Sequence, residues 1–266
     1  MPNNPDSTLL SCDNVSVNVP GRNLVDALSF ELHRGEIIAV LGRNGTGKSL
    51  SLLTMAGLRT PQSGQVRLQA NDIFATQRQD TARHLALLPQ VIDDIFPATV
   101  LDTVLIGRHP HIAPLSWESA EDYDIAEAAL RQMGLHDLRD RDILTLSGGE
   151  RRRLAVAQVL AQSPGIYLLD EPTNHLDPQH QLDALRVFRQ AAEGGAGVIA
   201  SLHDVNLAAR FADRCLLLFG DGRWQLGACD EVLNEGTLGE LYGTPIESIN
   251  WRSSSLFVAL SGDPTT

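Results

Sequence analysis

The chain has 266 residues, of which 43% are hydrophobic and 20% are charged, so it is long enough for one large domain or for a core with an inserted subdomain. Its formal net charge of −12 at pH 7 argues against sequence-independent binding of nucleic acid, which depends on clustered lysine and arginine. We therefore expect no nucleic acid among its partners.

Short strands are predicted for the first part of the chain. Apolar residues alternate in 14–19 and 28–35, which is typical of half-buried strands, and 36–42 is an apolar run suited to a buried strand. A glycine-rich segment then leads into a short apolar helix that ends near Gly57. Further strands are predicted at 63–72 and 83–90.

The character of the sequence changes near Val91. Three segments from there to residue 163 have helical periodicity, and Thr99 and Ser119 are suited to N-cap two of them. We therefore take 91–163 as an inserted helical subdomain. The three predicted helices cover 99–108, 119–135 and 148–162.

Strands return in the last third of the chain. The apolar run 165–172 predicts a buried strand, and the helix after it starts with Asp177 at the N-cap and a proline at its first position. Segment 197–203 predicts another buried strand, and 215–226 predicts a hairpin. Strands that alternate with helices indicate a mainly parallel sheet with helices on both faces. From Trp251 onward we expect one strand and a frayed polar end.

The three cysteines, Cys12, Cys215 and Cys229, are widely spaced and form no pattern that is typical of a zinc site. They indicate reduced thiols in a cytosolic protein. No segment approaches the roughly 18 apolar residues of a membrane-spanning helix. If the protein serves a membrane, we expect it to do so through a partner.

Residues 42–49, GRNGTGKS, fit the phosphate-loop pattern G-x-x-x-x-G-K-[ST] and lie between a predicted strand and a predicted helix. Glycines allow the backbone to curl so that its N–H groups face phosphate oxygens. Lys48 would place its charge on the β and γ phosphates, and Ser49 would offer its hydroxyl to Mg²⁺. The predicted ATP contacts in this region are Gly42, Arg43, Asn44, Gly45, Thr46, Gly47, Lys48, Ser49 and Leu50.

Two carboxylates follow a second apolar strand. Asp170 and Glu171 come at the C-terminal end of IYLLD, and open α/β sheets bind ligands at that end of their strands. We expect Asp170 to hold Mg²⁺ through water, and Glu171 to polarise a water for attack on the γ phosphate. Together with the phosphate loop, this pair predicts ATP hydrolysis.

The order of the motifs resembles the nucleotide-binding subunit of ABC (ATP-binding cassette) transporters, over about residues 8–245. LSGGE, residues 146–150, is similar to the signature of that family, and NHLD, residues 174–177, matches the loop that crosses between two nucleotide sites. Gln90 matches the family's glutamine loop, and His203 matches its switch histidine. The resemblance implies catalytic roles for Lys48, Gln90, Glu171 and His203, and Mg²⁺ contacts from Ser49, Gln90 and Asp170.

The resemblance also implies an α/β fold, namely a P-loop NTPase (RecA-like) core with a parallel sheet, an N-terminal antiparallel β subdomain and an inserted α-helical subdomain. On this interpretation residues 1–90 and 164–245 form the nucleotide-binding core with its β subdomain. Residues 91–163 form the helical subdomain that carries the signature, and 246–266 form a C-terminal tail.

A second copy of the chain is an implied partner, because members of this family close on ATP as a sandwich dimer. Segments 104–111 and 203–214 resemble importer ATPases for iron–siderophore complexes, haem and cobalamin. Those ATPases lie peripherally at the cytoplasmic face of the inner membrane and serve multi-span permease subunits, to which a periplasmic protein delivers the cargo. The residues expected to contact the partner's ATP are Ser147, Gly148, Gly149, Glu150 and Asp177.

Two other interpretations stay open. One is a soluble ABC ATPase of iron–sulfur cluster assembly, and the other is an ABC importer or exporter ATPase with another cargo. The family usually carries an aromatic residue that stacks on adenine, whereas this chain offers only Val17 or Val19 there, and we take Val19 as the contact. Arg151–Arg153 are expected to form a solvated face, and His109 and His111 to lie on the surface.

Overall fold

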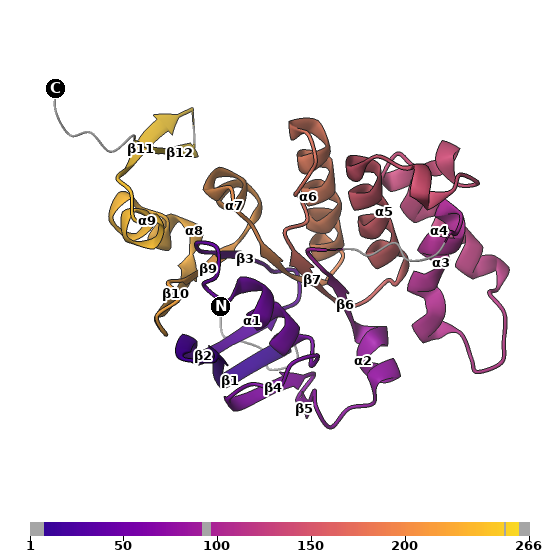
Figure 1. Ribbon diagram of the computed structural model, residues 1–266, viewed down its shortest axis with the longest axis horizontal. Coiled ribbons are helices and arrows are strands. Elements are labelled where there is room, and N and C mark those ends of the chain that lie inside the picture. Colours follow the sequence, from indigo (N-terminus) through magenta and orange to yellow (C-terminus); the bar gives the residue numbers. More distant parts are fainter. Residues whose placement is uncertain (1–7, 92–96, 253, 261–266) are drawn as a thin grey trace.

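A six-stranded sheet, ordered β10–β9–β3–β8–β7–β6, lies at the centre of the computed structural model (Figure 1), which describes residues 8–91, 97–252 and 254–260. Strands β9, β3, β8, β7 and β6 run parallel, and β10 forms the predicted hairpin with β9. Every residue of β3, β7 and β8 is buried, because both faces of the sheet are covered. The strands are β3 (Ile37–Leu41), β6 (Leu85–Leu88), β7 (Ile166–Asp170), β8 (Gly197–Ser201), β9 (Arg214–Leu218) and β10 (Trp224–Ala228).

One face of this sheet is covered by a second, antiparallel sheet and by helix α1 (Lys48–Met55). Ile38 and Val40 of β3 and Leu168 of β7 pack into one buried cluster with the apolar residues of these elements. The antiparallel β subdomain expected at the N-terminus is therefore confirmed. Its strands, in the order β2–β1–β4–β5, are β1 (Thr8–Val19), β2 (Arg22–His33), β4 (Ser63–Leu68) and β5 (Asn71–Asp72).

Helices cover the opposite face. Ile37, Ala39 and Leu41 of β3 pack toward them, because successive residues of a strand point to opposite sides of the sheet. The helices-on-both-faces arrangement predicted from the sequence is thus confirmed. The covering helices are α5 (Gly148–Ala161), α6 (Pro178–Glu193) and α7 (Val205–Phe211), and three other helices are α2 (Arg78–His84), α8 (Cys229–Val232) and α9 (Glu235–Tyr242).

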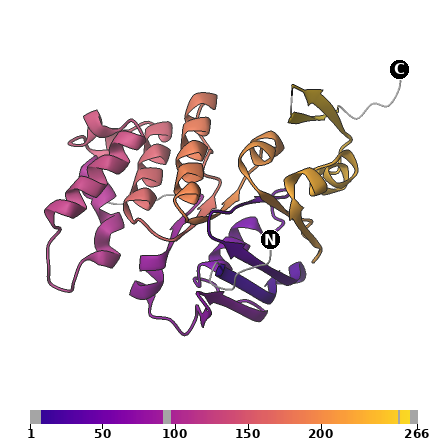
Figure 2. The ribbon, with the colours of Figure 1, turned by 180° about the vertical axis from the view of Figure 1, so that it is seen from behind.

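The signature helix α5 gathers with α3 (Val100–Leu105) and α4 (Ala120–Gln132) at the end of the molecule away from the C-terminus, as both views show (Figures 1 and 2). Thr99 and Ser119 N-cap α3 and α4 with complete capping boxes, which confirms both predicted caps. The helix predicted over 99–108 is only partly α-helical, since a 3₁₀ helix (Ile106–His111) that contains Pro110 follows α3.

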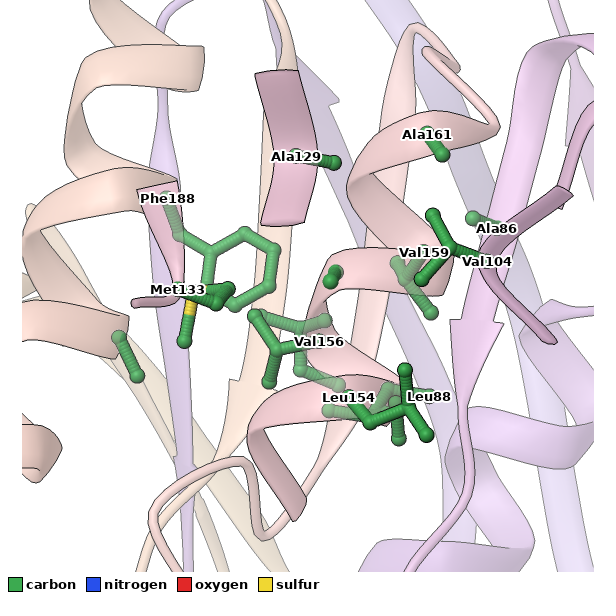
Figure 3. Packing of buried hydrophobic residues seen from close by; sticks show 14 of the residues in the cluster. Ala86, Leu88, Val104, Ala129, Met133, Leu154, Val156, Val159, Ala161 and Phe188 are labelled. Atoms are coloured by element: carbon green, nitrogen blue, oxygen red, sulfur yellow. The ribbon is translucent and has the colours of Figure 1, made fainter. Parts of the chain in front are cut away.

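Helix α5 is packed into the main interior of the protein. Figure 3 shows Leu154 and Val156 of α5 between Phe188 of α6 and Leu88 of β6, and all four side chains belong to one buried cluster. Because protein interiors are close-packed, a movement of α5 must displace its neighbours on the central sheet. The boundary that we propose for the helical subdomain near Val91 adjoins residues outside the described part of the chain.

A buried ion pair joins the 3₁₀ helix after α3 to α4. Arg108 Nε donates to Asp122 Oδ1 at 2.9 Å, and Arg108 Nη1 donates to the carbonyl of Ala161 at 2.8 Å. Both charged residues are more than nine-tenths buried. Hydrogen bonds from Ser119, followed by the bond from Arg108, lower the pKa of Asp122 to about 2. The pair therefore stays ionised at all but strongly acid pH.

We expect Arg108→Met to lower the free energy of unfolding at pH 7 by about 3 kcal/mol, because it leaves the Asp122 carboxylate buried without its cation. Urea denaturation measures this loss. Since the pKa of Asp122 is depressed in the folded state, the stabilisation should fade as the pH falls from about 4 toward about 2. The exposed pair of Arg131 with Glu127 provides a control, and Arg131→Met should cost less than about 1 kcal/mol. Equal losses of unfolding free energy in Arg108→Met and Arg131→Met would contradict a larger contribution from the buried pair.

The C-terminal tail contains the strand that we expected after Trp251, and a second strand, which the sequence did not predict, precedes it and pairs with it. Strands β11 (Ile246–Trp251) and β12 (Ser254–Ala259) form an antiparallel hairpin. Asn206 of α7 holds it, since its Oδ1 accepts from the N–H of Phe257 at 2.8 Å and its Nδ2 donates to the carbonyl of Phe257 at 3.2 Å. An isolated hairpin is only marginally stable, so this one depends on a helix that is distant in the sequence. The polar end beyond residue 260 lies outside the described residues.

Cys12, Cys215 and Cys229 are all free thiols. Burial raises the pKa of the Cys12 thiol well above its ordinary value. Within the described ranges, no helix is both long and apolar enough to cross a membrane.

Candidate functional site

The phosphate loop connects the end of β3 to the first residue of α1. Gly42 has a φ of 155°, and a Cβ there would lie 2.5 Å from the carbonyl oxygen of Leu218, so only glycine fits. Lys48 turns back over the loop, and its Nζ donates to the carbonyls of Gly42 at 2.8 Å and Arg43 at 3.2 Å. Thr46 Oγ1 donates to the Arg43 carbonyl at 2.9 Å. These bonds hold the loop in its curled form.

The Lys48 ammonium lies among negative charges. Burial lowers the pKa of Lys48, while the nearby carboxylates of Glu171 and Asp170 raise it. A buried cation facing a cavity attracts an anionic ligand, because it has lost much of its hydration. This environment suits the phosphate contact that the loop pattern predicted.

The loop opens onto a cavity of about 620 Å³, which lies in the size range of small-molecule sites. The structure brings Gln90, Glu171 and His203 to this cavity together with the phosphate loop, although these residues lie far apart in the sequence. Gly42, Arg43 and Thr46, which we also expected to contact ATP, are not in its lining. The lining residues are Val19, Arg22, Leu24, Asn44, Gly45, Gly47, Lys48, Ser49, Leu50, Gln90, Glu171, Asn174 and His203.

Glu171 is held by three side chains from three different segments. Gln90 Nε2 donates to Glu171 Oε2 at 3.0 Å, and Asn174 Nδ2 donates to the same oxygen at 3.2 Å. His203 Nε2 lies 2.5 Å from Oε1, within hydrogen-bonding distance. Glu171 is only 6% exposed and has a φ of 52°, which is unusual for a residue with a side chain. Strain of this kind is typical of sites where the surroundings fix a group for chemistry.

Asp170 lies one residue before Glu171 and is equally buried. Ser201 Oγ donates to Asp170 Oδ1 at 2.6 Å and accepts from the Glu171 N–H at 2.9 Å, so one hydroxyl orients both acidic residues. Carboxylate, hydroxyl and amide oxygens are the ligands that Mg²⁺ prefers, and Asp170, Ser49 and Gln90 supply one of each around Lys48. Because Gln90 presents its Nε2 to Glu171, its amide oxygen is left for a cation. The residues present therefore fit a magnesium ion, which Asp170, lying outside the cavity lining, would contact through water.

The signature residues do not line this cavity. Ser147 N-caps α5, where its Oγ accepts from the N–H of Glu150 at 3.3 Å and its own N–H donates to Glu150 Oε2 at 2.7 Å. Gly148 and Gly149 form the first turn of α5, and Ser147 and Gly148 are exposed. Asp177 is also exposed and N-caps α6, accepting from the N–H of His180 at 3.0 Å. Ser147, Gly148 and Asp177 are thus exposed and lie outside the lining of their own chain's cavity.

The matches to known proteins agree with this geometry. Residues 25–174, more than half of the chain, match the family model of the ABC transporter. The chain belongs to the ABC transporter family. ATP-binding proteins of this family hydrolyse ATP to power transport, and this ABC ATPase has that activity.

Relatives of this ABC ATPase include proteins named for import. It is 37% identical over 244 residues to the hemin import ATP-binding protein HmuV of Rhodopseudomonas palustris (strain BisA53), covering 89% of this chain and 88% of that protein. It is 36% identical over 231 residues to the cobalamin import ATP-binding protein BtuD of Halobacterium salinarum, covering 86% of this chain and 57% of that protein. Among solved structures, an inward-facing metal-chelate type ABC transporter matches with a TM-score of 0.83 and 30% identity, covering 96% of this chain and 98% of that one.

We expected Arg151–Arg153 to form a solvated face, and this prediction is wrong for Arg152. Arg152 is 4% exposed, whereas Arg151 and Arg153 are half-buried.

The sequence did not identify Arg22 as a lining residue of the cavity. The signal for it was weak, because Arg22 is an exposed residue directly after the Pro20–Gly21 turn. His109 and His111 are exposed as expected.

Val19, rather than Val17, reaches the nucleotide cavity of this ABC ATPase. Val17 of β1 is fully buried in the core, while Val19 at the end of β1 lines the cavity together with Leu50. We expect Val19→Tyr to tighten ATP binding up to about tenfold, because an aromatic ring stacked on adenine contributes about 0.5–1.5 kcal/mol. Titration with a fluorescent ATP analogue measures this. The matched control is Asn23→Tyr on the same hairpin, which lies outside the cavity lining and should leave affinity unchanged. No gain with Val19→Tyr would remove this position from the adenine contact.

Proposed function

We propose that this chain is the ATP-hydrolysing subunit of an importer that moves a metal chelate (haem, cobalamin or an iron–siderophore complex) through separate membrane subunits. The observation that carries the proposal is the similarity, over 89% of the chain, to a protein named for hemin import. Similarity to a protein named for cobalamin import and to a metal-chelate type transporter supports the same class of cargo.

The active unit that we propose is a dimer of the chain closed around ATP. Ser147 and Gly148 are exposed, and the first turn of α5 lies outside the chain's own nucleotide cavity. In the dimer, Ser147, Gly148 and Gly149 of one copy would contact the γ phosphate held by the other copy, with Glu150 and Asp177 beside them. Hydrolysis removes the phosphate that bridges the copies, so they separate and the membrane subunits change their access.

Glu171 is the proposed base for hydrolysis. Its carboxylate would orient a water and take up the proton that the water loses as it attacks the γ phosphorus, which leaves ADP and phosphate as products. Lys48 would bind the phosphate oxygens, and His203 would fix Glu171 through the contact of Nε2 with Oε1. Magnesium held by Ser49, Gln90 and Asp170 would neutralise charge on the phosphates.

We place the protein peripherally at the cytoplasmic face of the inner membrane, bound to a multi-span permease that receives cargo from a periplasmic binding protein. Reconstitution tests this. The chain is purified with its membrane partner and inserted into vesicles with ATP on the side that carries the chain. Haem, cobalamin and a ferric siderophore are then offered with the binding protein.

ATP-dependent accumulation of one of these chelates is the expected result. Copurification with a soluble iron–sulfur scaffold, without any membrane partner, would overturn the importer proposal in favour of the soluble alternative. ATP-dependent movement of a chelate away from the side that carries this chain would favour an exporter.

A further inference from the structure

Arg152 occupies an unusual place for an arginine. It lies in the second turn of the signature helix α5, and 4% of its surface is exposed. Its guanidinium leaves the helical region and reaches the C-terminal ends of β6 and β7, where the glutamine loop and the acidic pair begin. Nη1 donates to the carbonyls of Pro89 at 2.7 Å and Gln90 at 3.5 Å, and Nη2 donates to the carbonyls of Asp170 at 2.6 Å and Glu171 at 2.7 Å.

These bonds offset part of a costly burial, because Arg152 Nε is buried without a hydrogen-bond partner among the described residues. A guanidinium loses strong hydration on burial, and this loss lowers the pKa of Arg152 to about 10 even though the charges of Asp170 and Glu171 oppose the shift. The partners are backbone carbonyls rather than a carboxylate, so the planar fork is used to hold two stretches of main chain in register. Two neighbouring parallel strands end there, which makes Arg152 a cross-link between their ends.

Both stretches carry groups that act on ATP in the proposed function. The carbonyl of Gln90 and the carbonyl of Glu171 are bonded to the same guanidinium, while their side chains are bonded to each other at 3.0 Å. Glu171 also has the positive φ described above, which persists only when the surroundings over-determine it. Arg152 supplies part of that constraint from the backbone side.

We propose that Arg152 is a positioning residue for ATP hydrolysis, holding Gln90 and Glu171 in their catalytic arrangement and tying both to the signature helix. This inference rests on the proposed roles of Glu171 and Gln90. Ser147 caps the same helix. The contact of Ser147 with a partner's ATP and the position of the chain's own Glu171 carboxylate therefore both depend on one short, rigid segment of α5.

The neighbouring residue provides a matched control. Arg153 lies on the same helix and is half-buried, but its Nη1 donates to the carbonyl of Met133 at 3.0 Å, within the helical region. We compare Arg152→Met with Arg153→Met by steady-state hydrolysis of ATP. Arg152→Met should reduce kcat about tenfold or more, because a hydrogen bond from a charged donor commonly accounts for about that factor. Its KM for ATP should change less than about threefold, and Arg153→Met should keep kcat within about twofold.

Arg152→Lys separates positioning from simple support of the fold. Lysine keeps the positive charge but lacks the planar fork, so it should restore thermal stability more fully than it restores kcat. It also covers the case in which Arg152→Met does not fold. If kcat and the melting temperature recovered in parallel, Arg152 would be a structural residue and the proposal would fail.

A double-mutant cycle with Gln90→Ala tests whether Arg152 acts through the glutamine loop. The two substitutions should be non-additive, so that Arg152→Met lowers kcat by a smaller factor in the Gln90→Ala protein than in the wild type. Equal factors in the two backgrounds would overturn the proposed coupling.

The kcat of the Glu171→Gln protein is measured in the same assay. Full activity of that variant would remove the carboxylate role, whereas normal kcat in Arg152→Met beside an inactive Glu171→Gln would overturn the Arg152 proposal alone.

Discussion

Replacing Glu171 with glutamine is expected to reduce kcat for ATP hydrolysis by at least about 10²-fold while ATP binding is retained. Glutamine has nearly the same shape and can still accept from Gln90 or Asn174, so the cavity should keep its form. A neutral amide cannot take up the proton that the attacking water loses. ATP should therefore persist in the closed site and trap a dimer, which size-exclusion chromatography with ATP and Mg²⁺ detects.

The control for Glu171→Gln is Glu240→Gln, which removes an exposed carboxylate that pairs with Arg223. It makes the same chemical change outside the nucleotide cavity and should leave hydrolysis and the monomer–dimer ratio unchanged. Steady-state hydrolysis at the wild-type rate in the Glu171→Gln protein would eliminate Glu171 as the base.

Ser147→Arg is expected to abolish ATP turnover without weakening ATP binding by the isolated chain. Ser147 lies outside its own chain's cavity, so the new side chain does not touch the bound nucleotide there. In a closed dimer it would occupy the place of the partner's γ phosphate and prevent closure. Equilibrium binding of ATP to the monomer measures the affinity, and phosphate release by the dimer measures the turnover.

Part of any loss of activity in the Ser147→Arg protein comes from the loss of the N-cap of α5, because Ser147 Oγ accepts from the Glu150 N–H. Thr99 caps α3 with an equivalent capping box, so Thr99→Arg shows what the loss of a cap does alone, about 1 kcal/mol of stability. It should keep most of the turnover. An equal loss of activity in both proteins would mean that Ser147 acts through stability only.

A mixed dimer decides which site Ser147 serves. When one copy carries Ser147→Ala and the other carries Glu171→Gln, both defects fall in the same composite site if the serine acts across the interface. The second site then stays intact, and turnover should exceed that of either homodimer. If the serine acted on its own chain's ATP, each site would carry one defect and no gain would appear.

The sequence by itself determined the elements whose geometry depends on near neighbours. The phosphate loop followed from glycine spacing, because Gly42 must adopt a backbone and a closeness to Leu218 that no side chain permits. The N-caps at Thr99, Ser119 and Asp177 followed from a polar residue before an amphipathic helix, since the bonds span only three residues. The parallel sheet followed from apolar runs that alternate with helices.

Only the tertiary structure decided which residues meet around Glu171 and which arginine is buried. Gln90 lies 81 positions and His203 lies 32 positions from Glu171, and they meet because their strands end at the same edge of one sheet. Three successive arginines on a helix look alike in the sequence. The packing of α5 against the central sheet turns Arg152 alone toward the ends of β6 and β7. Periodicity describes how one element is patterned, whereas the direction in which it faces depends on the element it packs against.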